Sequence, residues 1–413
     1  MKFSKKYFLA VSIPILVLMG YWGLATKKNI TLLPLVPSGK NENPINSSST
    51  EKKPNEFVRN TVFIDTPNIV KGIYLTSWSG GSKKKIDEVI RLSKTFGINS
   101  VVIDIKDFSG YLAYDTGLEQ VKKYKAHEIK IANITDVINR LHSENIYTIA
   151  RITVFQDPVM AKARPDFAVR RKSTSGIWLD RKGLGWIDPS NKDYWNYIVD
   201  ISKDARSRGF DELNFDYIRF PSDGNLADME FPSWNQKIPK NEIIREFFKY
   251  LRDNLPGVKI SADLFGLTTV QKDDLGIGQI IEDAYENFDY VSPMVYPSHY
   301  ASGFIGYKNP AKYPYEVIKY SLDSAVKKLS VLDGSASATS TTSTASASPT
   351  NSIVNDKKFA ELRPWIQDFD LGADYNAQMV RLEIKAVRDA LGDRYAGFLL
   401  WSPSNIYTLE ALQ

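Results

Sequence analysis

Hydrophobic residues recur along the chain in short β-branched runs, and these runs alternate with longer stretches of helical periodicity. Such alternation is typical of parallel βα units. The short runs predict strands at residues 71–76, 100–106, 147–155, 212–218, 259–264, 290–296, 363–368 and 397–401. The longer runs predict helices at residues 83–96, 132–144, 191–208, 240–254, 277–287, 314–330 and 375–391, with a short terminal helix at 405–412.

Eight strands, each followed by a helix, favour a closed (β/α)8 TIM barrel over an open doubly wound sheet. An open sheet of that kind usually has a glycine-rich phosphate loop after its first strand, and residues 74–81 do not fit that pattern. Gly97, Gly209 and Gly392 follow three of the helical stretches, where a left-handed C-cap is expected.

The N-terminus carries an uncharged, mostly apolar run from Tyr7 to Ala25, between Lys5 and Lys6 on one side and Lys27 on the other. A run of this length spans a bilayer as a helix, and the preceding lysines favour a cytoplasmic N-terminus. Residues 1–28 are therefore predicted to be a transmembrane signal anchor or a cleaved signal peptide, with the anchor preferred. In both cases the rest of the chain is extracytoplasmic, either anchored to the membrane or secreted.

Two stretches are too poor in large apolar residues to build a core. Residues 29–61 are predicted to be a flexible linker, and the Ser/Thr/Ala-rich stretch at about 333–355 is predicted to be a disordered insertion. The barrel domain is expected to cover residues 62–413 around that insertion.

Charge and composition exclude several kinds of protein. The lysines before residue 29, where no acid occurs, account for the whole net charge of +5, so the rest of the chain shows no excess of positive charge for a nucleic acid. There is no cysteine, and the three histidines lack the spacing of a zinc site. We expect no metal, no cofactor and a monomer.

Catalytic residues of such barrels project from the C-terminal ends of the strands. Carboxylates and aromatic rings dominate those ends in this sequence. Hydrolysis of a glycosidic bond needs two carboxyl groups across the bond, one as proton donor and one as nucleophile or base. Asp216 and Asp263, on the fourth and fifth predicted strands, are the candidate catalytic pair; Asp216 lies in an otherwise apolar strand, where a charge is costly unless the site uses it.

Other polar and aromatic residues at the strand ends are candidates for binding a sugar. Side chains of this kind hydrogen-bond hydroxyl groups, orient a carboxylate or offer a flat stacking surface. The predicted substrate-binding residues are Asp104, Arg219, Tyr296, Gln367, Trp401 and Trp78. Basic residues in the long segment 158–191 point to an anionic glycan, and a solvated loop is the competing interpretation.

The run from Gly209 to Pro221, preceded by residues 186–191, closely resembles the bacterial "putative glycosyl hydrolase domain", a family of barrels. Residues 71–76, 102–107, 291–297 and 401–403 fit the same pattern, so the resemblance covers roughly residues 68–412. It implies a TIM barrel that hydrolyses a polysaccharide or oligosaccharide.

A more distant resemblance is to the chitinase-like barrels, whose fourth strand ends in Asp-x-x-Asp-x-Asp-x-Glu. Alignment of Asp211, Asn214 and Asp216 with those acids places Ile218 where the proton-donating Glu belongs. The chitinase mechanism therefore does not carry over, and Asp216 is expected to act as nucleophile or base, with Asp263 or another acid as proton donor.

Two other functions remain open from the sequence. A non-catalytic, membrane-anchored carbohydrate-binding barrel would keep the aromatic residues Trp401 and Tyr296 but would have no need of Asp216. A metal-assisted hydrolase would use Asp104 and Asp107 as oxygen ligands of Mg²⁺ or Ca²⁺. The glycosidase without a metal is preferred over both.

Overall fold

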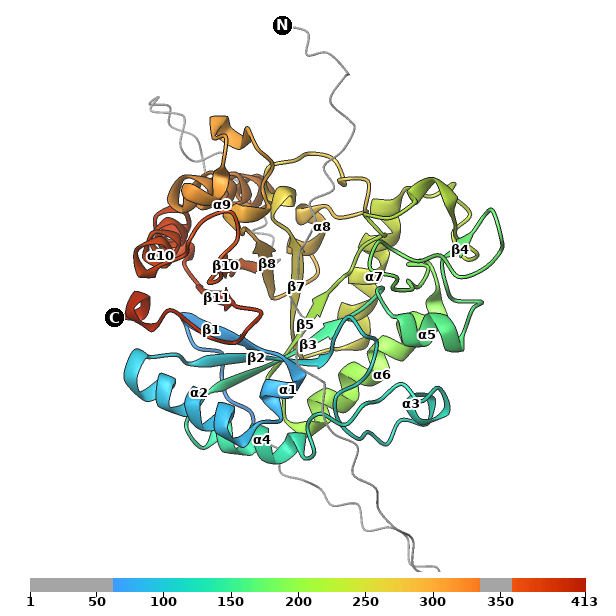
Figure 1. The fold of residues 1–413 in the computed structure, drawn as a ribbon, viewed down its shortest axis with the longest axis horizontal. Helices are drawn as coiled ribbons and strands as arrows, with labels where there is room; N and C mark the ends of the chain where they lie inside the picture. The colour runs from blue at the N-terminus through green and yellow to red at the C-terminus, as the bar shows by residue number, and fades with distance from the viewer. Residues whose placement is uncertain (1–61, 335–358) are drawn as a thin grey trace, which may run out of the picture. The chain divides into compact units, whose positions relative to one another are not determined.

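The computed structural model describes residues 62–334 and 359–413, and these residues form the predicted barrel (Figure 1). All the barrel strands pair in parallel in the order β10, β11, β1, β2, β3, β5, β7, β8, and a pairing of β10 with β8 closes the sheet. The strands are β1 (Val70–Leu75), β2 (Ser100–Lys106), β3 (Tyr147–Thr153), β5 (Glu212–Asp216), β7 (Lys259–Phe265), β8 (Tyr290–Met294), β10 (Trp365–Gln367) and β11 (Gly397–Trp401). β9 (Glu361–Leu362) precedes β10 and pairs with the start of β8.

Helices surround the strands, as Figure 1 shows. The longer ones are α2 (Lys83–Phe96), α4 (Ile134–His142), α6 (Lys192–Arg208), α7 (Lys240–Asn254), α9 (Pro314–Leu332) and α10 (Ala377–Leu391), with shorter ones at α1 (Ser77–Gly80), α3 (Glu119–Lys123), α5 (Pro158–Ala163) and α8 (Ile281–Tyr285). Side chains cap several N-termini as their types predict; Asn191, for example, accepts a hydrogen bond from the amide of Tyr194. Gly97 and Gly209 end α2 and α6 in the left-handed conformation, as predicted.

Some predicted elements are shorter in the structure. The helix predicted at 277–287 is reduced to α8, and the terminal helix predicted at 405–412 is a 3-10 turn at Leu409–Leu412. The strand predicted at 212–218 ends at Asp216 because Tyr217 adopts φ 54°, outside the extended region. The strand predicted at 363–368 is reduced to β10, and the two-residue strand β9 precedes the predicted range.

Alternation along the strands separates two apolar clusters. One lies between strands and helices and includes Ile73, Val101 and Ile103. The other, a smaller cluster within the barrel, includes Val102 and Ile149. Successive side chains of a strand point to opposite faces of the sheet. Every second residue therefore points into the barrel, and polar residues of the strands are among them.

The long connections after β3 and β5 join in a small second sheet. There β4 (Arg170–Arg171) pairs antiparallel with β6 (Met229–Glu230). Within residues 62–334 and 359–413 no helix is long and apolar enough to cross a membrane. The predicted N-terminal anchor and linker, and nearly all of the predicted insertion at 333–355, lie outside the described residues.

Candidate active site

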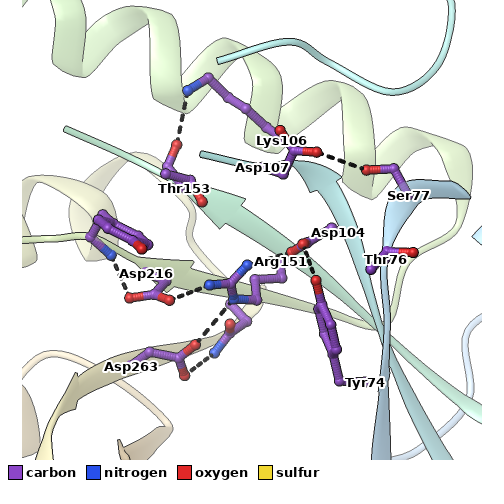
Figure 2. A network of polar contacts seen from close by, with 12 residues as sticks. Tyr74, Thr76, Ser77, Asp104, Lys106, Asp107, Arg151, Thr153, Asp216 and Asp263 are labelled. Atoms are coloured by element: carbon purple, nitrogen blue, oxygen red, sulfur yellow. Dashed lines mark hydrogen bonds and ion pairs between the residues drawn. The ribbon is translucent and has the colours of Figure 1, made fainter. Parts of the chain in front are cut away.

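Arg151, on β3, lies at the centre of a buried polar cluster inside the barrel (Figure 2). Its Nη1 donates a hydrogen bond to Asp104 Oδ1 at 2.5 Å, and its Nη2 donates to Asp216 Oδ2. Its Nε lies 3.6 Å from Asp263 Oδ2. One guanidinium group therefore joins three carboxyl groups, which come from β2, β5 and β7. We call Arg151 and these three aspartates the arginine cluster.

Asp216 occupies the last position of β5 and is the most exposed of the three carboxyl groups, with 8% of its side chain accessible. Its second oxygen, Oδ1, accepts a hydrogen bond of 2.5 Å from the amide of Tyr217. The backbone of Tyr217 has φ 54°, a region that costs a bulky residue free energy. Strained backbone of this kind is concentrated at functional sites, where the surrounding structure holds it in place.

Asp263 is more deeply enclosed, with 1% of its side chain accessible. Its Oδ1 accepts hydrogen bonds of 2.8 Å from both Asn214 Nδ2 and Trp365 Nε1. Asp104 is held from the other side of the cluster, where Tyr74 donates its hydroxyl to Oδ2 at 2.5 Å. Each aspartate therefore has a neutral hydrogen-bond donor in addition to its contact with the guanidinium.

Burial raises the pKa of two carboxyl groups of the arginine cluster. Burial, and then the charge of Asp216, raise the pKa of Asp263 to about 8 against the opposing effect of Arg151. Burial also raises the pKa of Asp104, although Arg151 and Tyr74 oppose that shift. Burial alone would lower the pKa of Arg151, but the charges of Asp104 and Asp216 outweigh it and hold that pKa well above its usual value. At neutral pH a carboxyl group that keeps its proton thus lies beside a permanent positive charge.

An aromatic group borders the cluster. The rings of Tyr74 and Trp401 stack at a centroid distance of 4.0 Å, and the ring of Trp365 meets Trp401 edge-on at 5.5 Å. The guanidinium carbon of Arg151 lies 5.2 Å from the centre of the Trp401 ring. Trp401 is only partly buried and so has a surface available to a ligand.

The other predicted binding residues do not all join the cluster. Gln367 is 0% exposed, and its amide oxygen accepts from Ser298 while its amide nitrogen donates to the carbonyl of Phe369. Both ends of its amide are thus occupied within the protein, so the prediction that Gln367 binds substrate has no obvious free group to support it. Tyr296 is 5% exposed and packs edge-on against Phe369.

Trp78 and Arg219 have different surroundings. Trp78, on α1, is 64% exposed and has the ammonium group of Lys130 5.7 Å from its ring centre. Arg219 follows β5 and is surrounded by aromatic rings. Neither residue has a direct contact with the aspartates of the arginine cluster. Ile218, at the position of the chitinase acid, is buried.

Asp104 and Asp107, the two acids that a metal site would use, bind different partners within the protein. Asp104 is bound by Arg151 and Tyr74, whereas Asp107 accepts hydrogen bonds from Lys130 and Ser109. Within the described residues there is no group of three or more His, Cys, Asp or Glu side chains placed to hold a metal ion.

A cavity of about 760 Å³ lies outside the arginine cluster. It is lined by Lys312, Met379 and residues 370–374, which follow β10. It contains none of the three carboxyl groups of the arginine cluster, whose side chains are at most 8% accessible.

Sequence analysis missed Arg151 and Tyr74 as members of the site. Both lie on barrel strands at positions that alternate with apolar residues. Arg151, in the run Ile149–Ile152, carries the same signal as Asp216, a charge within an apolar strand, and this signal could have identified it. Tyr74 has no comparable signal, because tyrosine is common in strands.

Residues 72–407 match the family model described as "Putative glycosyl hydrolase domain". No curated protein matches the chain significantly. A hypothetical protein from Ruminiclostridium thermocellum ATCC 27405 is 38% identical, over 50% of this chain and 98% of its own, with a TM-score of 0.44. Alpha-L-fucosidase isoenzyme 2 from Paenibacillus thiaminolyticus is 12% identical, with 83% of this chain and 48% of that enzyme covered and a TM-score of 0.51.

The glycoside hydrolase domain of PelA from Pseudomonas aeruginosa is 9% identical, with 83% of this chain and 97% of that domain covered and a TM-score of 0.42. Of these structures, the fucosidase supports the barrel fold, and this chain spans about half of its length. The family match confirms the resemblance that the strand-end motifs indicate.

Proposed function

The chain belongs to the "Putative glycosyl hydrolase domain" family, and on this premise we propose that it hydrolyses a polysaccharide or oligosaccharide at the arginine cluster. The observation that carries the proposal is the contact of Arg151 with both Asp216 and Asp263, the second of which has its pKa raised to about 8. Two-carboxylate glycoside hydrolysis requires a second carboxyl group that still holds a proton to donate.

Asp216 is the proposed nucleophile or base. Its contacts with the guanidinium of Arg151 and the amide of Tyr217 are those of an ionised carboxylate, and it is the most accessible of the three acids. Asp263 is the proposed proton donor because its raised pKa keeps the proton on the carboxyl group at neutral pH. In the reaction, Asp263 would protonate the leaving oxygen while Asp216 attacks the sugar carbon or activates water.

The aromatic group formed by Tyr74, Trp365 and Trp401 is the proposed platform for a sugar ring. The exposed ring of Trp78 would bind a more distant part of the glycan. We further propose that the substrate lies outside the cytoplasm, in the cell wall or an extracellular polysaccharide. The apolar run Tyr7–Ala25 and its flanking lysines support this location.

Asp216→Asn tests the proposal. We expect hydrolysis of a responsive polysaccharide to fall by about 10²–10⁴-fold, with glycan binding retained, because the amide keeps the shape of the carboxylate but cannot attack or accept a proton. Release of reducing sugar measures the rate. The matched control is Asp115→Asn, a change to an exposed aspartate outside the arginine cluster, which should leave the rate unchanged. Equal activity of Asp216→Asn and the unaltered protein would contradict the assignment.

A glycan-binding barrel without catalysis is the second candidate. The observation in its favour is the enclosure of Asp263, whose Oδ1 already accepts two hydrogen bonds and whose side chain is 1% accessible. This candidate predicts that the protein binds a polysaccharide with equal affinity before and after Asp216→Asn and releases no reducing sugar in either form. Affinity electrophoresis beside the hydrolysis assay distinguishes the two functions.

A further inference from the structure

Arg219 is a buried cation in the connection that follows β5, three residues beyond Asp216. It is 7% exposed. Its Nη1 donates hydrogen bonds to the carbonyl of Phe220 at 3.1 Å and to Ser222 Oγ at 3.0 Å. Those two contacts fix the orientation of the guanidinium and use one of its three nitrogens.

Three aromatic rings enclose the Arg219 guanidinium. The centres of the Phe265, Trp186 and Tyr217 rings lie 4.6, 4.8 and 5.2 Å from its carbon. Tyr217 adjoins Asp216 in sequence, and Phe265 ends β7 two residues after Asp263. The strands that carry the proposed catalytic pair therefore also bring this aromatic enclosure to the same end of the barrel.

Arg219 lacks the counter-ion that other enclosed arginines have. Arg151 contacts aspartates and Arg363 contacts Glu212, whereas no carboxylate lies within ion-pair distance of Arg219 among residues 62–334 and 359–413. Burial lowers its pKa, and the opposing charges of Tyr217, Asp216 and Asp223 do not outweigh that effect. An enclosed charge without a partner is unfavourable. The free protein therefore bears a cost that a negatively charged ligand would remove.

Two nitrogens of Arg219 remain for such a ligand. Within the described part of the chain, Nε and Nη2 form no hydrogen bond, and neither is among the fully enclosed polar atoms without a partner. Both therefore keep some access to solvent. Nε and Nη2 form one edge of the guanidinium, and that edge matches two oxygens of a carboxylate or phosphate.

We propose that Arg219 binds an anionic substituent of the glycan, a carboxylate or a phosphate, next to the bond that is cleaved. This inference rests on the proposed function, because it gives a substrate class to the same site. The aromatic rings on three sides of the guanidinium limit its contact with water and strengthen its pairing with an anion. A neutral sugar would leave the cation without a partner.

Affinity electrophoresis of the full-length protein tests this inference with matched polysaccharides. One arm compares polygalacturonate and alginate with their carboxyl-reduced forms. The other compares a phosphorylated mannan with its dephosphorylated form. We expect an anionic polysaccharide of one arm to retard the protein and its uncharged form not to do so. The arm that shows this difference identifies the recognised group as a carboxylate or a phosphate.

Variants at Arg219 separate recognition from general effects of charge. Arg219→Gln should weaken retardation by the anionic polysaccharide about tenfold or more, and Arg219→Lys should weaken it less because the ammonium keeps the charge but not the two-nitrogen edge. Arg206→Gln is the matched control. Arg206, on α6, also stacks on an aromatic ring, that of Phe63, and donates to backbone carbonyls, but these carbonyls belong to the residues just before β5, at the opposite end of that strand from Asp216. Arg206→Gln should leave the retardation by the anionic polysaccharide unchanged.

Several results would overturn the inference. These are equal retardation of the unaltered protein and Arg219→Gln, retardation by neutral polysaccharides alone, and no retardation in either arm. The hydrolysis assay keeps the proposed function separate. Arg219-dependent retardation without any release of reducing sugar would leave anion recognition standing and remove the glycosidase. If the protein hydrolyses a neutral glycan and Arg219→Gln leaves that rate unchanged, the glycosidase stands and anion recognition by Arg219 is ruled out.

Discussion

Arg151 controls the charge of the site because, among residues 62–334 and 359–413, it alone contacts Asp104, Asp216 and Asp263 together. Without it, three acids inside the barrel would have to bind protons or separate. With it, Asp216 is paired with a cation. Burial and the nearby charge of Asp216 raise the pKa of Asp263 to about 8, although Arg151 opposes the shift. The raised pKa of Asp263 thus arises from its surroundings and not from its residue type.

This difference predicts the pH dependence of catalysis. The value of kcat/KM should fall as the pH rises through about 8, because Asp263 then loses the proton that it donates. Asp263→Asn should be about 10²–10⁴-fold less active at neutral pH and should lack this alkaline limb. Initial rates between pH 5 and pH 10 measure both effects. An unchanged alkaline limb in Asp263→Asn would assign the proton donor to another residue.

The same ionisation affects stability. The pKa of Asp263 is about 8 in the folded protein and about 3.9 in an unfolded chain, so the folded state binds the extra proton between those values. Asp263 therefore adds most to the free energy of unfolding below about pH 4, and this stabilisation is lost as the pH rises through about 8. The free energy of unfolding of Asp263→Asn should therefore decline less over this window than that of the unaltered protein, as measured by urea titration.

At the scale of elements, closure of the barrel depends on how closely β11 approaches β1. Gly397 pairs with Val70 in the register of these strands and has φ 104°. A Cβ atom at Gly397 would lie 1.9 Å from the carbonyl oxygen of Val70. Only glycine satisfies both the backbone conformation and the close approach.

Gly397→Ala should therefore destabilise the barrel more than an ordinary glycine substitution does. The matched control is Gly392→Ala at the end of α10, where φ is 51° but nothing lies within 4 Å of the added Cβ. We expect the control to cost about 1 kcal/mol and Gly397→Ala about 2 kcal/mol more, because only the second substitution adds a steric conflict. Denaturant unfolding measures the difference, and equal losses would contradict this account of closure.

At the scale of the whole molecule, the residues just before β1 bind to the barrel. The amide of Ile64 donates to Asp211 Oδ1 at 2.8 Å, and the hydroxyl of Thr66 donates to that of Tyr147 at 3.1 Å. The side chain of Ile64 packs against the interior apolar cluster. Asp211 and Tyr147 lie at the N-terminal ends of β5 and β3, so this segment covers the end of the barrel opposite the proposed active site.

Removal of this segment should weaken the fold without altering the arginine cluster. A chain that begins at residue 69 should lose about 2 kcal/mol of unfolding free energy relative to one that begins at residue 62, from lost apolar burial and hydrogen bonds. Ile64→Ala in the longer chain should reproduce part of that loss. Urea titration of the three proteins provides the measurement, and equal midpoints for both chain lengths would contradict the prediction.

Prediction from sequence was strongest for features that repeat and weakest for single contacts. The alternation of strands and helices indicated the barrel, and the charged positions of β5 and β7 pointed to Asp216 and Asp263, which the structure brings to the same arginine. Element ends were less predictable: β5 stops at Asp216 because of the backbone of Tyr217. Gln367 is bound within the protein by Ser298 and Phe369, partners whose positions no local pattern reveals.

The sequence by itself determined the closed barrel and the strands that carry acids, because hydrophobic period and strand order are properties of the chain. Only the tertiary structure decided which acid faces Arg151 at which distance, and hence which acid keeps its proton. It also decided that Arg219 is enclosed without a counter-ion among the described residues. Acidity and pairing depend on burial and on neighbours from distant strands, and a linear sequence does not contain those distances.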